Sequence, residues 1–325
     1  VLDFLHGWLT VYEINKIVNY VSCISMKHTS PAGLAVGNSI RQDNLDIFGY
    51  EGNIDELSEC AKSFIKCRNG DPLSSFGDFI CFSSKLDIQT AKLIKKEVTD
   101  GILAPDFEEG VLEILKSKKN GKFIIIKVNK DYFETKNKEG WRETKEICGI
   151  KITQPNNNFN LEIDLDNGID IDSVIAYNSL KYTQSNNISM VNEGQLIGMG
   201  CGQQNRVACV KLAGDKSLIW RLRHHPDVID YYKSLSNLKR QEKVNLVYDY
   251  ISQNRDKLIK NILDINITMG SDGFFPFVDN IIVADSFQVK KIIQPGGSIM
   301  DQNVNEKCNE LGIKLHNVET RMFYH

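Results

Sequence analysis

Apolar positions recur along the chain at two spacings, which predict helices and strands in alternation. Apolar residues three or four positions apart predict helices in three windows, at 57–65, 107–115 and 304–311. Short apolar runs rich in β-branched residues predict strands at 21–26, 123–128, 207–211, 289–293 and 313–316. Such alternation predicts an α/β architecture with helices on both faces of the sheets.

The length of the chain predicts more than one ordinary hydrophobic core. At 325 residues it fits two domains, or one α/β unit built of two halves. The asparagine-rich stretch 154–167 has the weakest hydrophobic pattern and is the best candidate for a linker. We therefore expect a first lobe at 1–153, a linker at 154–170 and a second lobe at 171–325. No repeat of 20 to 50 residues is visible.

Composition narrows the class of protein. Hydrophobic residues make up 42% and charged residues 25%, the balance of a globular protein. The net charge of −3 gives no general attraction for nucleic acid or an anionic membrane, so we expect neither as a partner. No apolar run reaches the ~20 residues that span a bilayer, and the first residues lack the basic start of a signal peptide. These features predict a cytoplasmic protein.

The eight cysteines argue against a metal site. They contain no Cys-x-x-Cys pair and have no His-x-x-x-His nearby, so we expect neither a structural zinc nor a catalytic metal. Because they are spread along apolar segments, we interpret them as buried free thiols of a reducing compartment.

A first candidate for chemistry is Lys27-His28, which directly follows a predicted strand. Ligand sites of α/β proteins gather beyond the carboxyl ends of strands, where this pair could do acid–base work. The alternative is an ordinary turn, because Ser30-Pro31 and Gly33 follow and a Lys-His pair is usually solvated surface. Spacing alone favours the turn.

A second candidate combines the polar run 181–187 with glycines at 198, 200 and 202 and with Arg206. The glycines would let backbone amides approach a polar ligand, and the guanidinium could bind it with two donors. The run is not a Walker loop, and it matches a dinucleotide fingerprint poorly. The alternative is a bulged hairpin.

A third candidate is the aromatic run 274–277 beside Asp279, followed by the turn 294–298. Three phenylalanines around a proline usually pack into a core. They could instead line a slot for a flat heterocycle, with Gly-Gly-Ser as a turn that tolerates phosphate or a pterin.

Taken in order, these segments resemble the transformylase domain of the bifunctional purine-biosynthesis enzymes that also carry IMP cyclohydrolase. The resemblance implies two cytidine-deaminase-like α/β lobes without zinc, in a homodimer whose sites draw on both subunits. It rests on residues spread along nearly the whole chain, namely 26–37, Ser74-Ser75-Phe76-Gly77-Asp78, 97–105, 182–186, 202–206, 212–216, 222–226, 274–280 and the terminal Arg-x-Phe-x-His at 321–325.

The reaction implied by this resemblance is formyl transfer from 10-formyltetrahydrofolate to the 5-amino group of aminoimidazole carboxamide ribonucleotide (AICAR). Its products are the formamido nucleotide (FAICAR) and tetrahydrofolate, on the route to IMP. The acceptor amine is a poor nucleophile because its lone pair is delocalised, so a base must remove a proton as the bond forms. By the match, His28 would be the base, Lys27 would stabilise the oxyanion and Asn186 would orient the substrate.

The same resemblance implies two sets of binding residues. For AICAR they are Lys27, His28, Gly77, Asp100, Asn186, Arg206 and Phe274, with Arg321 on the 5′-phosphate and Lys119 and Asn245 as further contacts. For the folate they are Val207, Asp279, Ser298 and Ile299, with Gln204 as a polar contact and Leu73, Phe76, Pro276 and Phe277 as apolar walls.

Two departures and two alternatives accompany this interpretation. We expect no cyclohydrolase domain within these residues, and the family's Arg-bearing segment that precedes the Lys-His pair has no counterpart here. One alternative is a non-catalytic relic that binds purine nucleotide or folate, although such a relic need not keep Lys27-His28. The other is a zinc-dependent deaminase, which would require ligand cysteines and a His-x-Glu motif that are not found.

Overall fold

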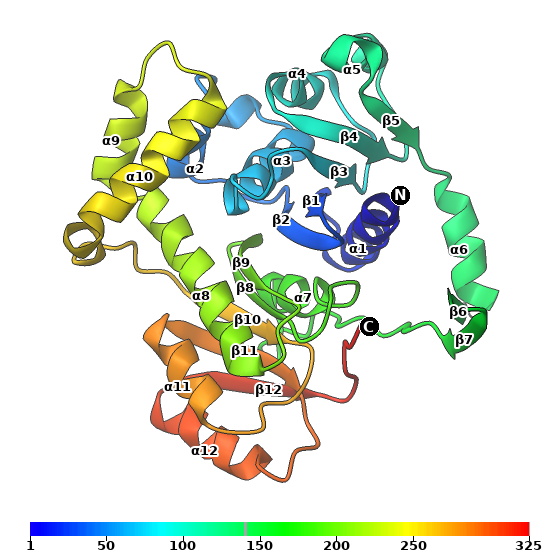
Figure 1. Ribbon diagram of the computed structural model, residues 1–325, viewed down its shortest axis with the longest axis vertical. Coiled ribbons are helices and arrows are strands. Elements are labelled where there is room, and N and C mark those ends of the chain that lie inside the picture. Colours follow the sequence, from blue (N-terminus) through cyan, green and yellow to red (C-terminus); the bar gives the residue numbers. More distant parts are fainter. Residues whose placement is uncertain (140–141, 325) are drawn as a thin grey trace.

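In the computed structural model, which describes residues 1–139 and 142–324, ten strands form one mixed sheet (Figure 1). The order across the sheet is β12-β11-β10-β8-β9-β2-β1-β3-β4-β5. The α/β class predicted from the sequence is thereby confirmed. The strands are β1 (Ser22–Lys27), β2 (Ser30–Val36), β3 (Asp78–Phe82), β4 (Thr99–Ala104), β5 (Ile124–Lys127), β8 (Ile188–Asn192), β9 (Gln195–Gly200), β10 (Ile267–Ser271), β11 (Val289–Pro295) and β12 (Lys314–Val318).

The two halves of the sheet repeat one topology. In each half an antiparallel hairpin, β1-β2 or β8-β9, pairs through its first strand with an antiparallel third strand, after which two parallel strands follow. Four helices occupy matching places in each half. In the first half they are α1 (Leu2–Val18), α3 (Glu59–Gly70), α4 (Ile88–Lys96) and α5 (Val111–Lys116), and in the second α7 (Ile171–Asn178), α8 (Arg206–Arg223), α11 (Asp279–Ser286) and α12 (Asp301–Glu310).

The halves join between β2 and β9, where Ala35 pairs with Gln195. Both strands carry glycines where a helix crosses at close range. A Cβ on Gly33 would lie 2.0 Å from the carbonyl oxygen of Cys67 in α3, and one on Gly198 would lie 2.2 Å from that of Ala213 in α8. Both glycines are therefore required by helix-to-strand packing, and the matched pair is a further mark of the repeat.

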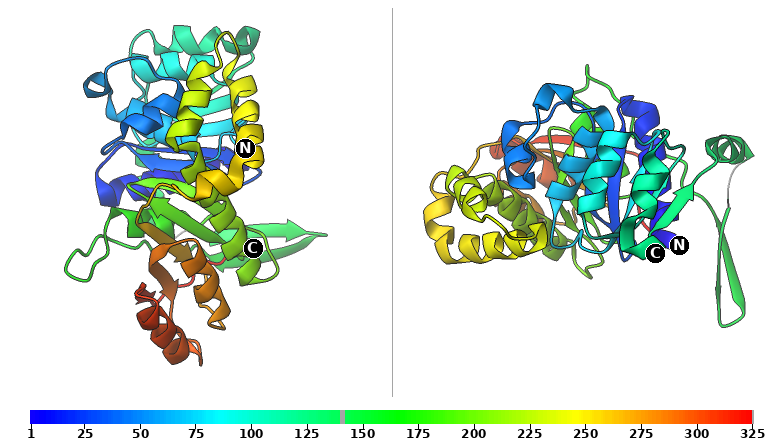
Figure 2. Two further views of the ribbon diagram at one scale, coloured as in Figure 1. Left: turned by 90° about the vertical axis from the view of Figure 1, so that its left-hand side faces the viewer. Right: turned by 90° about the horizontal axis from the view of Figure 1, so that it is seen from above.

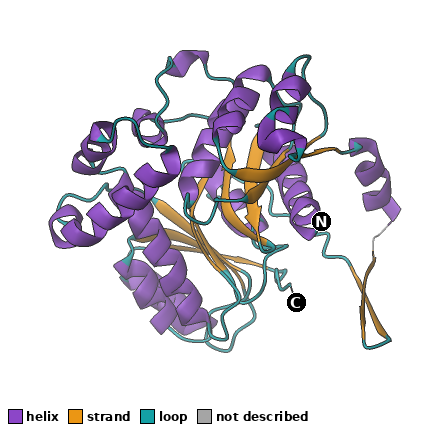
Figure 3. Ribbon diagram, turned by 45° about the horizontal axis from the view of Figure 1, so that its top comes forward, coloured by secondary structure: helices purple, strands orange, loops and turns teal. Residues whose placement is uncertain are grey.

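Helices cover both faces of the sheet (Figure 3). One face packs on α1 and α7, whose apolar side chains share a cluster with Ile24 and Leu34. The opposite face packs on α3, α4 and α5 in the first half and on α8, α11 and α12 in the second. Hydrophobic core therefore lies on both sides of a continuous sheet, as the alternating pattern predicts.

Some segments depart from the repeat, among them α2 (Gln42–Phe48), which has no counterpart between β9 and α8. A hairpin of β6 (Arg142–Ile147) and β7 (Ile150–Pro155) follows α6 (Lys130–Glu139) and extends away from the body (Figure 2). Helices α9 (Pro226–Ser234) and α10 (Arg240–Ile259) lie between α8 and β10, and α9 packs beside α2. Two short 3-10 turns complete the elements, η1 (Ile54–Glu56) and η2 (Lys118–Gly121). None of the helices within the described residues combines the length and the apolar character that a membrane span requires.

The structure corrects two predictions. The run 207–211, predicted as a strand, lies in α8, because the side chain of Asn205 accepts a hydrogen bond from the amide of Ala208 and caps a helix there. A short apolar run cannot by itself distinguish a strand from a buried helical segment. The other predicted strands and helices are present. Of the cysteines predicted as buried, Cys148 is exposed at the tip of the β6-β7 hairpin and Cys201 is half-buried.

Candidate functional site

One edge of the sheet carries the predicted site residues of the second half together with Lys27 and His28. The pairing of Lys27 with Ser30 places the β1-β2 turn at this edge. Gly200, at the end of β9, lies at the same edge, since Cys201 and Ser30 are joined by a 3.5 Å contact from sulfur to hydroxyl oxygen. The end of β10 lies at this edge too, because Ser271 pairs with Ile188, the first residue of β8, which in turn pairs with Gly200. Since β11 and β12 run parallel to β10, the segments that follow these strands lie at the same edge.

The first half contributes to the same edge through the starts of its parallel strands. Asp78 begins β3 beside the end of β1, and it pairs with Thr99 at the start of β4. The predicted site residues therefore lie in the loops that border this edge or at the adjoining ends of strands and helices. The exception is Asn245, which lies in α10 with an exposed side chain. Sequence reasoning placed ligand sites at carboxyl ends only, whereas β3, β4 and β5 contribute their amino ends.

Lys27 and His28 lie at the start of a tight hairpin turn. Both His28 (φ 52°) and Thr29 (φ 59°) are left-handed, the geometry of a two-residue type I′ turn. The carboxylate of Asp3 accepts a 2.6 Å hydrogen bond from the amide of Thr29, and Lys27 donates from Nζ to the carbonyl of Phe76 at 2.5 Å. The residues therefore form a turn, as the alternative interpretation predicted. Within this turn the side chain of Lys27 is restrained by its hydrogen bond, whereas His28 is exposed to solvent.

The amide of Asn186 is fixed by two neighbours. Its Nδ2 donates to the carbonyl of Gln203 at 2.9 Å, and its Oδ1 accepts from Nη2 of Arg206 at 2.8 Å. Its own carbonyl accepts from the thiol of Cys209, whose pKa burial raises to about 11, so the thiol stays protonated as a donor. The peptide bond between Ser185 and Asn186 is cis. One N–H of the Asn186 amide has no protein acceptor among the described residues and can donate to a ligand.

Arg206 is held in turn by a buried carboxylate. Its Nη1 forms an ion pair with Asp272, whose side chain is fully buried, and donates to the hydroxyl of Ser271 at 3.1 Å. The other oxygen of Asp272 accepts from the backbone amide of Asn187 at 3.2 Å. Sequence reasoning did not assign a role to Asp272, although the residue lies in the run that drew attention to the aromatic segment beside it. Its partner, Arg206, can be identified only from the folded structure, in which β8, β10 and α8 lie side by side.

The C-terminal segment is anchored beside this ion pair. Met322 donates from its amide to the carbonyl of Asp272 at 2.9 Å, and the amide of Asn157 donates to the carbonyl of Arg321 at 3.1 Å. The guanidinium of Arg321 lies 5.1 Å from the ring centroid of Phe274 and remains exposed. The last residue of the predicted terminal motif, His325, lies outside the described residues.

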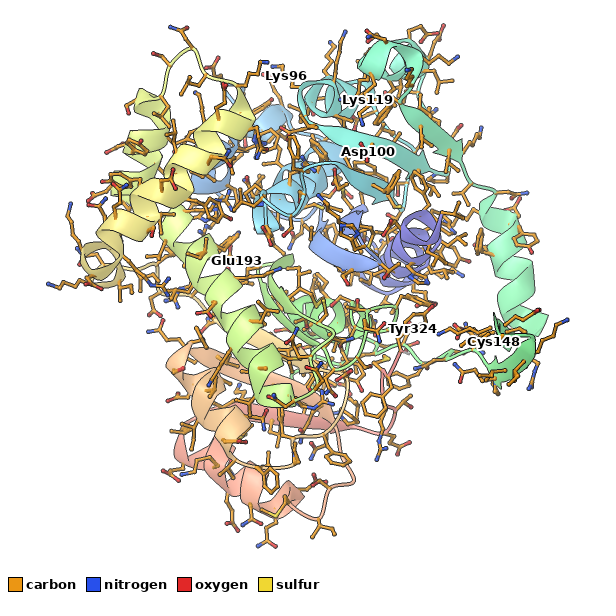
Figure 4. All side chains as sticks on the ribbon, viewed as in Figure 1. Lys96, Asp100, Lys119, Cys148, Glu193 and Tyr324 are labelled. Carbon is orange, nitrogen blue, oxygen red and sulfur yellow. The ribbon has the colours of Figure 1, made fainter. Side chains whose placement is uncertain are left out.

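Gly77, Asp100 and Lys119 come together in the first half. Asp100 and Lys119 form an ion pair in which both side chains stay partly exposed, and Figure 4 shows them between β4 and the end of α5. A Cβ on Gly77 would lie 3.9 Å from the carboxylate of Asp100, and Gly77 itself has a left-handed φ of 71°. This group therefore offers one cation and one anion next to an open backbone position.

Most of the predicted folate residues are exposed. Val207 lies in the first turn of α8, Asp279 begins α11, and Ser298 and Ile299 follow β11. Ile299 is 100% exposed and Phe277 is 60% exposed. The remaining predicted contacts are Leu73 and Phe76, each 40% exposed, the half-buried Pro276 and the exposed Gln204.

Two further observations describe what the candidate site lacks. Within residues 1–139 and 142–324, no group of three or more His, Cys, Asp or Glu side chains could hold a metal ion. The cavity between the first half and the α9-α10 segment, described below, is lined by none of the predicted site residues. The predicted residues along the sheet edge range from the buried Arg206 to the fully exposed Ile299.

Comparison with known proteins gives a match to a family model and matches to curated proteins. The family model described as "AICARFT/IMPCHase bienzyme" matches residues 1–216. Among curated proteins, the "Bifunctional purine biosynthesis protein PurH" of Prochlorococcus marinus (strain AS9601) is 28% identical over 314 residues, which cover 94% of this chain and 48% of that protein. The protein of the same name from Clostridium botulinum (strain Kyoto / Type A2) is 28% identical over 325 residues, covering 98% of this chain and 50% of that protein.

The chain spans about half the length of the curated relatives it matches. Its family match covers 216 of 325 residues and includes Lys27, His28, Asn186 and Arg206. The chain therefore belongs to the AICARFT/IMPCHase bienzyme family.

Proposed function

We propose that this chain transfers the formyl group of 10-formyltetrahydrofolate to the 5-amino group of AICAR, forming FAICAR and tetrahydrofolate. The observation that carries the proposal is the placement of Lys27 and His28 at the same sheet edge as the Asn186–Arg206–Asp272 network. Membership of the AICARFT/IMPCHase bienzyme family, and relatives named as purine biosynthesis proteins, support it.

In this reaction His28 is the general base. Its exposed imidazole takes the proton of the acceptor amine as the new C–N bond forms, which for a positioned base is worth a factor of about 10² to 10⁴ in rate. Lys27 lies next to it and stabilises the oxyanion of the tetrahedral intermediate. The hydrogen bond to Phe76 restrains its ammonium group and leaves two of its three donors for the substrate.

Asn186 positions the carboxamide and the reacting amine of AICAR. Because Arg206 and Gln203 hold its amide in one orientation, the remaining N–H points in a fixed direction before substrate arrives. Such preorganisation lowers the cost of aligning the reacting groups. Arg321 binds the 5′-phosphate of AICAR, and Phe274 packs against its heterocycle. The remaining predicted contacts complete the nucleotide site, namely Gly77, Asp100, Lys119 and the outlying Asn245.

The folate binds against the exposed apolar side chains at this edge. Leu73 and Phe76 in the first half and Phe277 and Ile299 in the second are too exposed to be core residues. We propose that they wall the folate in a homodimer whose sites draw on both subunits, with Val207, Gln204, Asp279, Ser298 and Pro276 completing the site.

Each half is a cytidine-deaminase-like lobe without zinc, an assignment that the repeated five-strand topology supports. The protein works in the cytoplasm without a catalytic metal.

The direct experiment is to incubate purified protein with 10-formyltetrahydrofolate and AICAR and to follow tetrahydrofolate formation. Turnover that requires both substrates supports the proposal. Tight binding of AICAR and folate by a dimeric protein without turnover would favour the non-catalytic relic instead.

A further inference from the structure

A cavity of about 1010 Å³ lies apart from the predicted site residues, between the first half and the α9-α10 segment. One wall comes from the end of α2, the loop after it and the end of α4. The facing wall comes from α9 and the start of α10. Figure 4 shows Lys96 between α4 and the loop that joins α9 to α10. Because α9 and α10 have no counterpart in the first half, this cleft, which we call the α10 cleft, is formed by a departure from the repeat.

The charge of the α10 cleft is strongly positive. Six basic side chains line it, namely Arg68, Lys96, Lys233, Lys239, Arg240 and Lys243, against three carboxylates. The whole chain has a net charge of −3, so this concentration of cations is local and opposite in sign to the total. Focused positive potential in a concave site attracts anions.

Half of these cations already have structural partners. Glu97 accepts from Arg68 at 3.0 Å and from Arg240 at 2.7 Å, and Lys233 pairs with Asp46 at 3.1 Å. Although burial opposes its charge, Arg240 and Arg68 hold the pKa of Glu97 below its ordinary value. These three cations are therefore at least partly compensated by carboxylates.

The other three cations, Lys96, Lys239 and Lys243, have no carboxylate within ion-pair distance among the described residues. The ammonium of Lys243 lies 5.1 Å from the ring centroid of Tyr232. Phe48 adds a second ring, with the guanidinium of Arg240 stacked 3.9 Å from its centroid. The α10 cleft therefore combines uncompensated cations with aromatic walls that are fixed by packing.

We propose that the α10 cleft is a second binding site for a small polyanion of the polyphosphate or oligocarboxylate class. Lys96, Lys239 and Lys243 bind its charged groups, while Phe48 and Tyr232 form the wall beside them. The volume is that of a small-molecule site rather than a macromolecular surface. Three separated cations suit a ligand with several anionic groups better than a single phosphate. This proposal does not depend on formyl transfer.

The test is isothermal titration of the full chain with inorganic tripolyphosphate and, separately, with the tripeptide Glu-Glu-Glu, at an ionic strength of about 50 mM so that screening is moderate. The test variant is Lys239→Gln/Lys243→Gln. The control is Lys116→Gln/Lys260→Gln, which removes the same charge from exposed positions outside the cleft. Thermal unfolding without ligand checks that both variants are folded.

We expect saturable binding of at least one probe, at one site per chain. The Lys239→Gln/Lys243→Gln variant should weaken it by about tenfold or more, since charge-assisted hydrogen bonds are lost, and the control should leave it unchanged. Binding of tripolyphosphate alone identifies the polyphosphate class, and binding of the peptide alone identifies the oligocarboxylate class. Binding of neither, or equal weakening by both variants, overturns the proposal.

Discussion

Arg206 donates a hydrogen bond of 2.8 Å from Nη2 to the side-chain oxygen of Asn186. The orientation of the amide that we assign to substrate positioning therefore depends on a buried guanidinium. That guanidinium is held by Asp272, a residue with no exposed surface. Because Met322 donates to the carbonyl of Asp272, the anchoring of the C-terminal segment is part of the same unit.

Replacing Arg206 with Met should lower the free energy of unfolding by roughly 3 to 5 kcal/mol, because Asp272 is left as a buried charge without its partner. Urea unfolding at neutral pH measures this directly. The matched control is the double variant Arg206→Met/Asp272→Asn, which should recover part of the loss since no buried charge remains. A single variant as stable as the wild type would show that the ion pair is not formed.

Gly33→Ala should destabilise the fold by about 1 to 3 kcal/mol, because the new methyl group would collide with the carbonyl oxygen of Cys67 and push α3 off β2. Gly296→Ala is the control, since its Cβ would meet only ordinary contacts at 3.5 Å or more. Thermal or urea unfolding of the two variants should separate them clearly. Equal stability would contradict the close packing of α3 on the sheet.

His224 should make stability depend on pH below neutrality. Burial lowers the pKa of this side chain to about 3, and its Nδ1 lies 2.7 Å from the carbonyl oxygen of Trp220. In the unfolded chain the imidazole takes up a proton below pH 6.5, whereas in the folded chain it remains neutral down to about pH 3. The unfolded state then binds more protons, so stability falls as the pH drops through this window, by roughly 1.4 kcal/mol per pH unit at most.

The measurement for His224 is the free energy of unfolding at several pH values for the wild type and for His224→Gln, which lacks the titrating group. The wild type should lose stability faster than the variant as the pH falls from 6.5 to 5. Parallel pH profiles for the two proteins would contradict the assignment.

Asn186→Ala should lower kcat with a smaller effect on the free energy of unfolding. The amide is only half-buried, so its loss disturbs packing little, but it removes the donor that aligns the acceptor amine. A drop of about tenfold to a hundredfold in kcat is expected if alignment is worth 1.4 to 2.7 kcal/mol. Steady-state kinetics with both substrates, alongside a urea unfolding curve, distinguish this from simple destabilisation.

Much of the fold could be predicted from the sequence because helical and strand spacing are local properties. The windows around Phe64, Val111 and Val304 are helices, and four of the five predicted strands are present. The strand predicted at 207–211 is wrong because the helix there depends on the Asn205 cap, a weaker signal than the four apolar residues in a row at 207–210. The repeat of the two halves could not be predicted because the halves share the order and direction of their strands. No repeated stretch of amino acids is visible in the sequence.

The candidate site could be predicted only in part. Lys27 and His28 stood out because they follow a predicted strand, whereas Asn186 and Arg206 lay in a polar run and after a glycine-rich run. The structure places all four at one edge of the sheet. Asp272 was missed because its role depends on contacts between β8, β10 and α8 that no local pattern encodes. Asn245 was included by resemblance, but among the described contacts its side chain meets only Gln241 on the same helix.

The measurement that tests the central claim most directly is tetrahydrofolate formation by the wild type and by His28→Ala, assayed with 10-formyltetrahydrofolate and AICAR. Because His28 is exposed at a hairpin turn, the variant should stay folded, as its unfolding curve will show. We predict turnover by the wild type and a loss of about 10² to 10⁴ in kcat for the variant. Equal turnover by the two proteins would contradict the assignment of His28 as the base.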